Sequence, residues 1–327
     1  MLGYGALEGV LSMADAISLL EEAARHDAAG RTALSPKYNM DFENGSMRML
    51  VAADHEAGYL ATKAYHTIQG VGVRYIVTLY RLRDGEPLAT LDGQLITDLR
   101  TGAASGAVAR KVPITGPVSV GIIGSGNQAR TQLESLCTVY RVQSAKVYSP
   151  TAANRERYAR AMSAKLGIPV SGAASAEDAV RGRTVVVTAT SARTTEPLVH
   201  GEWLSQCRLL CAVGNTRSQY AEVDADCFRN AELVIADSQH AWEEAGDLRR
   251  ALASGAVAQG KRVTLAQIVT GAAAVPPSGL VAFKSVGTAL QDLALAARYY
   301  ELLGAGADMP TMPQDLGRLR PSARASR

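Results

Sequence analysis

A buried strand followed directly by a glycine-rich turn constrains this chain more than any other feature. The strand is expected over residues 118–123, and Gly124, Ser125 and Gly126 follow it at once. Residues 128–139 then place apolar side chains at helical spacing. A strand, a tight glycine turn and a helix in this order are typical of a dinucleotide-binding unit, in which the helix N-terminus faces a pyrophosphate. An ordinary glycine turn without a cofactor is the alternative.

The residues of this turn have separate expected tasks. Gly124 permits the turn itself, and Gly126 lets the backbone approach a phosphate closely. Ala129 stands in place of a third glycine and still lets the helix pack closely on the strand. Asn127 and Gln128 begin the helix, so together with the three turn residues they are predicted cofactor contacts.

The end of the second strand of this unit indicates which dinucleotide is bound. A site for NAD needs an acidic residue there to bind the ribose hydroxyls. No acidic residue occurs between Val147 and Arg155. Side chains able to bind a 2′-phosphate occur instead, at Ser149, Thr151, Asn154 and Arg155. We therefore predict NADP(H) in preference to NAD(H), while the alternative is that Ser149 only caps the next helix.

Strand and helix patterns keep alternating through the second half of the chain, which predicts a parallel, doubly wound α/β sheet of the Rossmann type. Further apolar strands are expected at 184–189 and 208–213. Because the carboxyl ends of parallel strands meet at one edge of a sheet, Thr190, Val213 and Gly214 are predicted to line the cofactor site.

The chain divides into three expected segments. Residues 47–82 alternate in polarity like antiparallel strands, a turn follows at Asp84-Gly85, and 95–111 is expected to form a helix rich in small residues. A last helix at 288–303 is expected to return to the first domain, which is then discontinuous. The predicted segments are an α+β domain at 1–115, an NAD(P)-binding domain at 116–284, and a C-terminal segment at 285–327.

Composition excludes several classes of partner. Basic and acidic residues nearly balance, at 34 and 31, and no basic block is interleaved with aromatic residues, so nucleic acid is not an expected partner. No apolar run approaches the roughly 20 residues that span a bilayer, so no membrane partner is expected. The four cysteines match neither a metal site nor a disulfide framework, so we expect no metal and a cytoplasmic location.

Three basic residues of the first domain are candidates for binding an anionic substrate. A capping-box pattern at Ser12 and Asp15 predicts the start of a first helix, which is expected to stop at Gly30. Arg31 follows that helix, Lys63 lies in a strand, and Arg100 lies in the helix of small residues. A guanidinium group matches a carboxylate with two parallel hydrogen bonds, and an ammonium group adds a point charge. Each residue taken singly is more readily explained as a surface charge, and Arg100 least so.

Short motifs in a fixed order resemble the ornithine cyclodeaminase/mu-crystallin family, in particular its ketimine reductase branch. The resemblance extends from about Ser12 to Leu303. Its motifs are Gly30-Arg31-Thr32, Ala61-Thr62-Lys63, residues 85–93, residues 96–105, the Gly124 turn, Ala212-Val213-Gly214, Glu222-Val223-Asp224, and residues 283–287 with Asp292.

The resemblance implies a homodimer in which the first domain supplies a sheet to the dimer core. It also implies a substrate pocket between the domains. Arg100 and Thr101 are implied cofactor contacts, and Ser285, Val286 and Gly287 are implied to lie beside the nicotinamide.

The resemblance further implies an NAD(P)H-dependent imine reductase or amino-acid dehydrogenase acting on a small α-imino or α-amino acid. Arg31, Lys63 and Arg100 match the family's carboxylate-binding set, with Lys63 and Arg100 as the catalytic residues. An ornithine cyclodeaminase that forms proline, or a protein that only binds NADPH and a ligand, are the alternatives.

Two positions depart from the family's pattern. Cyclodeaminases have an aspartate as the base shortly after the glycine matching Gly214, whereas Thr216 stands there in this chain. A hydroxyl group is a poor base at neutral pH, which favours the reductase branch. The reductases' usual Met-Pro pair before the lysine is replaced by Met49-Leu50, which leaves the shape of the pocket open.

Overall fold

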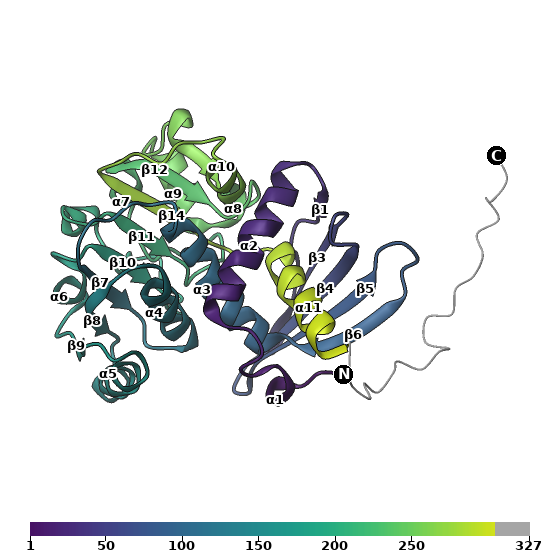
Figure 1. The fold of residues 1–327 in the computed structure, drawn as a ribbon. Helices are drawn as coiled ribbons and strands as arrows, with labels where there is room; N and C mark the ends of the chain where they lie inside the picture. Colours follow the sequence, from purple (N-terminus) through teal and green to yellow (C-terminus); the bar gives the residue numbers. More distant parts are fainter. Residues whose placement is uncertain (305–327) are drawn as a thin grey trace.

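The computed structural model describes residues 1–304 and gathers their strands into two sheets. One is an antiparallel sheet of six strands, and the other is a parallel sheet of eight strands (Figure 1). Helix α3 (Gly93–Ala109) leads from the first sheet to the second. Residues 305–327, the end of the segment predicted at 285–327, lie outside the described part of the chain.

All neighbouring strands of the larger sheet are parallel, in the order β13-β12-β14-β11-β10-β7-β8-β9. The order of the chain reverses between β7 and β10, so the predicted doubly wound fold is confirmed. The strands are β7 (Val118–Ile123), β8 (Val142–Tyr148), β9 (Val170–Gly172), β10 (Val185–Thr188), β11 (Leu209–Ala212), β12 (Ala231–Ala236), β13 (Arg262–Thr264) and β14 (Leu280–Lys284).

Both faces of this sheet are covered. Val185 and Val187 of β10 belong to one hydrophobic core, whereas Val186 between them belongs to another on the opposite face. The strands are therefore apolar throughout, as strands covered on both faces are. The covering helices are α4 (Asn127–Val139), α5 (Ala152–Leu166), α6 (Ala176–Val180), α7 (Ala225–Arg229), α8 (Ala241–Glu244), α9 (Gly246–Ala253) and α10 (Leu265–Thr270), with short 3-10 turns η1 (Gly201–Leu204) and η2 (Gln259–Lys261).

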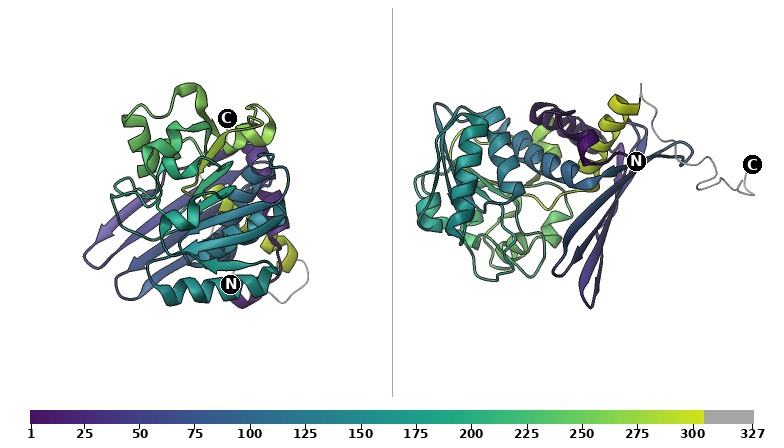
Figure 2. Two further views of the ribbon diagram at one scale, coloured as in Figure 1. Left: turned by 90° about the vertical axis from the view of Figure 1, so that its left-hand side faces the viewer. Right: turned by 90° about the horizontal axis from the view of Figure 1, so that it is seen from below.

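The smaller sheet is antiparallel, in the order β1-β3-β4-β5-β6, and β2 also pairs with β3. Three of its strands match those predicted between residues 47 and 82, whereas β1 and β2 were not predicted. Figure 2 shows that this sheet extends away from the rest of the molecule. Its strands are β1 (Thr32–Leu34), β2 (Tyr38–Phe42), β3 (Gly45–Asp54), β4 (Tyr59–Ile68), β5 (Gly72–Arg81) and β6 (Pro87–Asp92).

A helix at the end of the described chain packs on one face of the smaller sheet, and a helix from the start of the chain lies beside it. After the short helix α1 (Tyr4–Leu7), helix α2 (Met13–Ala28) begins at the predicted capping box, where Ser12 Oγ accepts from Asp15 N and Asp15 Oδ2 accepts from Ser12 N. Helix α11 (Ala289–Gly304) lies beside α2 and packs on β3 and β4 (Figure 1).

Small residues on α3 let it pack tightly between α2 and α4. A Cβ atom added at Gly102 would lie 2.6 Å from the carbonyl oxygen of Thr131 on α4. A Cβ added at Gly106 would overlap Ser135 on α4 and Ile17 on α2. This packing fixes the two sheets relative to each other, and with them the walls of the cleft between the sheets.

Candidate active site

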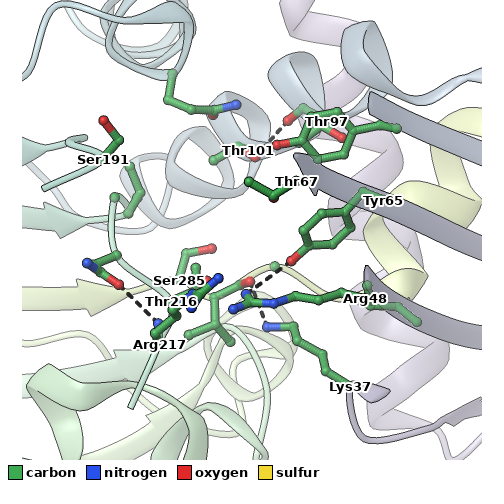
Figure 3. A pocket seen from close by; sticks show the side chains of 18 of the residues that line it. Lys37, Arg48, Tyr65, Thr67, Thr97, Thr101, Ser191, Thr216, Arg217 and Ser285 are labelled. Carbon is green, nitrogen blue, oxygen red and sulfur yellow. Dashed lines mark hydrogen bonds between the residues drawn. The ribbon is translucent and has the colours of Figure 1, made fainter. Parts of the chain in front are cut away.

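A cleft between the two sheets is lined by residues from both (Figure 3). One wall comes from β3, β4, β5 and α3, and the other from the carboxyl ends of β10, β11 and β14 with the loops that follow them. The predicted site residues that line it are Lys63, Arg100, Thr101, Gln128, Thr190, Val213, Gly214, Ser285, Val286 and Gly287.

Lys63 and Arg100 share one buried carboxylate, that of Asp292 on α11. Lys63 Nζ lies 2.7 Å from Asp292 Oδ1 and donates to Thr97 Oγ1 at 2.7 Å. Arg100 Nε lies 3.3 Å from the same Asp292 oxygen. The side chains of Lys63 and Asp292 are only 2% and 1% exposed. Two cations against one carboxylate leave a net positive charge that an anionic ligand would neutralise.

The environment of Lys63 favours exchange of a proton near neutral pH. Burial lowers the pKa of Lys63 to about 8, although the Asp292 carboxylate stabilises the charged ammonium. Lys63 Nζ also lies 5.3 Å from the centre of the Tyr75 ring. Burial raises the pKa of Tyr75 to about 12, so that phenol stays neutral beside the ammonium.

Arg31 does not lie with Lys63 and Arg100, which corrects the predicted carboxylate-binding set. Its Nε donates to Glu56 Oε1 at 2.7 Å, and its side chain is 54% exposed. Arg31 directly follows Gly30, whose φ of +68° ends the α2 segment, and so it lies outside the sheet that forms the cleft wall. Arg31 therefore forms an ion pair with Glu56 on the surface and does not line the cleft.

Arg48 on β3 lies in the cleft instead and was not predicted. Its Nη1 donates to the Tyr65 hydroxyl at 3.3 Å, and the side chain reaches toward the loop that carries Thr216 (Figure 3). Arg48 pairs with Tyr65 across the strands, and Leu50, two residues on, pairs with Lys63. Because side chains two residues apart share a face of a sheet, Arg48 lies on the same face as Lys63. This period of two was the signal in the sequence that could have identified Arg48.

The glycine turn after β7 has the geometry that a dinucleotide requires. Gly124 has a φ of +112°, and a Cβ atom there would overlap the carbonyl oxygen of Ala189. A Cβ at Gly126 would meet no atom within 4 Å, so that position is open to a ligand. Gly126 begins α4 without a side-chain cap, which leaves the helix N-terminus for a phosphate. Gln128 Nε2 donates to Asp98 Oδ1 at 2.7 Å and so links α4 to α3.

The residues predicted to bind a 2′-phosphate lie after β8 but are only partly gathered. Ser125 Oγ donates to Ser149 Oγ at 3.0 Å, and Arg155 Nη1 donates to the Ser149 carbonyl oxygen at 2.9 Å. Asn154 Oδ1 instead accepts from Arg157. Thr151, not Ser149, is the first residue flanking α5, and no side chain caps that helix. Ser149 is therefore not used as a helix cap.

Two buried carboxylates that were not predicted as site residues hold the loops at the sheet edge. Glu222 accepts hydrogen bonds from the backbone N–H groups of Thr190 at 2.8 Å and Gly214 at 2.9 Å, which joins the ends of β10 and β11. Asp237 Oδ2 accepts from the N–H groups of Val286 at 2.8 Å and Gly287 at 2.6 Å. The sequence did not predict these contacts, because the N–H groups belong to other loops of the chain.

Gly287 also allows the Arg100 side chain to pack closely against the loop after β14. Its φ is +77°, and a Cβ atom there would lie 2.8 Å from Arg100 Cζ. The guanidinium group therefore packs directly against the Gly287 backbone. Arg100 Nη1 also donates to Gln291 Oε1 at 3.3 Å. Arg100 thus connects α3 to the loop after β14.

The loop after β11 lines the cleft with Asn215, Thr216 and Arg217. Thr216 lies in the cleft wall, and no carboxylate side chain of the described residues lines the cleft beside it (Figure 3). The loop is anchored from below by Lys284, whose Nζ donates to the Asn215 carbonyl oxygen at 2.7 Å and contacts Asp247 Oδ2 at 2.6 Å. This anchor places Arg217 at the rim of the cleft.

The family model for the ornithine cyclodeaminase/mu-crystallin family matches residues 1–306. The chain belongs to that family. Alanine dehydrogenase from Archaeoglobus fulgidus is 30% identical to it over 304 residues, which are 90% of this chain and 92% of the relative. The predicted family is therefore confirmed.

Solved structures of the family share this fold closely. The Δ1-pyrroline-2-carboxylate reductase of Thermococcus litoralis, in complex with NADH and L-proline, is 29% identical, with a TM-score of 0.86 over 94% of this chain and 99% of that one. An archaeal alanine dehydrogenase dimer with bound NAD is 27% identical, with a TM-score of 0.84 over 94% and 97% of the two chains.

These relatives bear out the predicted class of activity, that of an NAD(P)-dependent oxidoreductase acting on C=N or CH–NH bonds. The structural neighbours were solved with NADH and NAD, so the prediction of a nicotinamide dinucleotide is confirmed only at that level. Within residues 1–304, no helix is both long enough and apolar enough to cross a membrane.

Proposed function

We propose that this protein is an NAD(P)-dependent oxidoreductase that interconverts a small α-imino acid and the corresponding α-amino acid. The observation that carries the proposal is the buried group of Lys63, Arg100 and Asp292. It faces the loop of Ser285, Val286 and Gly287 at the carboxyl edge of the parallel sheet, where dinucleotides bind in doubly wound folds.

In this proposal the cations of the cleft hold the substrate's α-carboxylate. Lys63 and Arg100 are fixed by Asp292, and Arg48 lies on the same sheet face as Lys63. Fixed charges of this kind orient the C=N carbon, and correct orientation contributes several kcal/mol to lowering a barrier. When bound, the nicotinamide supplies the hydride that adds to this carbon.

Reduction of the imine also requires one proton at nitrogen, since the C=N bond gains a hydride at carbon. We assign that proton to Lys63 Nζ. Its pKa of about 8 lies near neutral pH, and a general acid is most effective when its pKa is close to the pH of the reaction. Thr97 Oγ1 and Asp292 Oδ1, each 2.7 Å away, would stabilise the ammonium before transfer.

For the cofactor we propose NADPH over NADH. The support is the absence of an acidic side chain between Val147 and Arg155, together with the pair of Ser149 and Arg155 at the end of β8. The phosphates would lie at the open Gly126 position before α4. Dissociation constants for NADPH and NADH test this choice, and equal or tighter binding of NADH would reject it.

We propose that the protein is a homodimer formed through the smaller sheet. Residues 1–115 would be the dimerisation and substrate-binding domain and 116–284 the cofactor domain. Of the predicted C-terminal segment 285–327, the described part up to residue 304 would return to the first domain. The cross-strand pairs place five exposed apolar side chains on the sheet face opposite Lys63. They are Tyr38, Met40, Phe42, Met49 and Ile76. An apolar face of this kind marks an interface, and the archaeal alanine dehydrogenase neighbour is a dimer. Location in the cytoplasm remains a prediction from the sequence.

The test of the activity is a screen of linear and cyclic α-imino acids for substrate-dependent oxidation of NADPH and NADH. Ornithine with catalytic NAD⁺ or NADP⁺ is included, and proline is assayed as its product. We expect imine reduction and no proline, since Thr216 cannot deprotonate an alkyl ammonium with a pKa near 10.4. Oxidation of neither cofactor by any imino acid would refute the proposal, and proline formation at a comparable rate would reassign the enzyme to the cyclodeaminases.

A further inference from the structure

The cleft holds more positive charge than one α-carboxylate requires. No acidic side chain lines it, whereas six basic side chains do: Lys37, Arg48, Lys63, Arg100, Arg193 and Arg217. Lys63 and Arg100 share Asp292, and Lys37 Nζ lies 2.7 Å from Glu244 Oε2. Within residues 1–304, Arg48, Arg193 and Arg217 form no ion pair with an acidic side chain. Three acidic residues, Asp41, Glu243 and Glu244, line the adjoining hollow beyond Arg48 and Arg217 without forming an ion pair with either. The three guanidinium groups are therefore available to an anionic ligand in the cleft.

The basic side chains of the cleft lie at different positions along the length of β3 and do not all face one point. The side chains of Ser46, Arg48 and Leu50 share the face of β3 that lines the cleft, because they lie two residues apart. Leu50 pairs with Lys63 on β4. Arg217 Nη2 lies 3.5 Å from Ser46 Oγ. Four residues of strand separate Ser46 from Leu50, roughly 13 Å at about 3.3 Å per residue. Lys63 and Arg217 thus face separate regions of the cleft, with Arg48 between them.

The two regions belong to different elements, which makes the outer one a separate binding feature. Lys63 lies on β4 and is held by Asp292, whereas Arg217 and Arg193 lie on the loops after β11 and β10. The Arg217 loop is itself fixed, because Lys284 donates to the Asn215 carbonyl oxygen. The backbone that carries Arg217 is therefore held in place, and the contact with Ser46 Oγ directs the guanidinium group toward β3.

We infer that the substrate carries a second carboxylate, which Arg217 binds, with Arg193 nearby, while Lys63 and Arg100 bind the α-carboxylate. A monocarboxylic imino acid would leave the outer guanidinium groups without a counter-charge, whereas a dicarboxylic one neutralises both regions. The separation along β3 requires a substrate longer than a three-carbon acid. This inference rests on the proposed function, since it assigns the substrate class of the same site.

The test measures binding, which does not depend on turnover. The full-length protein saturated with NADP⁺ is titrated by calorimetry with 2-oxoglutarate and with 2-oxopentanoate, which have the same chain length and differ in the terminal carboxylate. The wild type should bind 2-oxoglutarate about 10- to 150-fold more tightly, as expected for one charge-assisted contact. Arg217→Ala should lose that preference and leave the affinity for 2-oxopentanoate unchanged, and Arg217→Lys should retain part of it.

Arg181→Ala is the control, because Arg181 is an exposed partner of Glu177 on the surface and should alter neither affinity. Equal affinities in the wild type, or a preference that survives in Arg217→Ala, would overturn the inference. Tighter binding of 2-amino-4-phosphonobutanoate than of glutamate would also overturn it, by assigning the outer region to a phosphate. Hydride transfer to monocarboxylic imino acids without a dicarboxylate preference would reject this inference alone. A retained preference without any hydride transfer would reject the proposed reaction alone.

Discussion

Replacing Arg48 by alanine tests the arrangement of the cleft most directly. Arg48 shares a sheet face with Lys63, its nearest polar contact is the Tyr65 hydroxyl at 3.3 Å, and it has no acidic partner in the described chain. Its proposed contact with the α-carboxylate is charge-assisted and contributes about 1.5–3 kcal/mol. Loss of this contact should raise the Michaelis constant about 10- to 150-fold. The turnover number should change less, because the contact is present in both the ground and transition states.

Arg31→Ala is the matched control, since it removes the same charge from the same domain. The Arg31 side chain is 54% exposed and paired with Glu56 on the surface, and exposed pairs contribute only about 0–1 kcal/mol to stability. Its Michaelis constant should stay within about twofold of the wild type. Initial rates of NADPH oxidation at varied imino acid concentration measure both variants. An effect of Arg31→Ala as large as that of Arg48→Ala would refute the assignment of the cleft face.

Other predictions concern pH, the cofactor and assembly. Burial lowers the pKa of Lys63 from 10.5 to about 8, so loss of the ammonium above about pH 8 should raise the Michaelis constant and, since Lys63 is the proposed proton donor, lower the turnover number; initial rates across pH check this. Because the unfolded chain binds the Lys63 proton more tightly, its contribution to the free energy of unfolding should increase between pH 8 and 10.5, which denaturant titrations measure. Ser149→Asp should shift the ratio of the two dissociation constants toward NADH, because a carboxylate repels a 2′-phosphate and binds ribose hydroxyls; an unchanged ratio would contradict this cofactor site. Met49→Arg should convert the dimer to a monomer in light scattering, and a monomeric wild type would contradict the proposed interface.

Local signals in the sequence accounted for the parallel sheet and its glycine turn. The strand at 118–123 occurs at the residues predicted. The capping box of Ser12 and Asp15 forms as its spacing indicated. Each of these features depends on residues close together in the chain, so composition and spacing are sufficient to identify them.

Contacts between segments far apart in the chain could not be predicted from the sequence in this way. The choice of Arg48 over Arg31 depends on which face of β3 packs toward the cleft, and that is fixed by pairing with β4. Glu222 and Asp237 become structural anchors only because loops far away in the chain bring N–H groups to them. Strand β2 is exposed along its whole length, so it lacks the alternation of buried residues that identified its neighbours.

The carboxylate of Asp292 has a consequence for how the protein is made. Lys63 lies 229 positions before Asp292 in the chain, and Arg100 lies 191 positions before its other α11 partner, Gln291. During synthesis both cations emerge long before the helix that carries their partners, and closing so long a loop delays their pairing. The glycine turn and strands β7 to β11 can pair while the ribosome is still extending the chain, whereas β14, which joins β11 to β12, emerges only just before α11. The buried group of Lys63, Arg100 and Asp292 is therefore completed only after α11 has been synthesised and has docked on the smaller sheet.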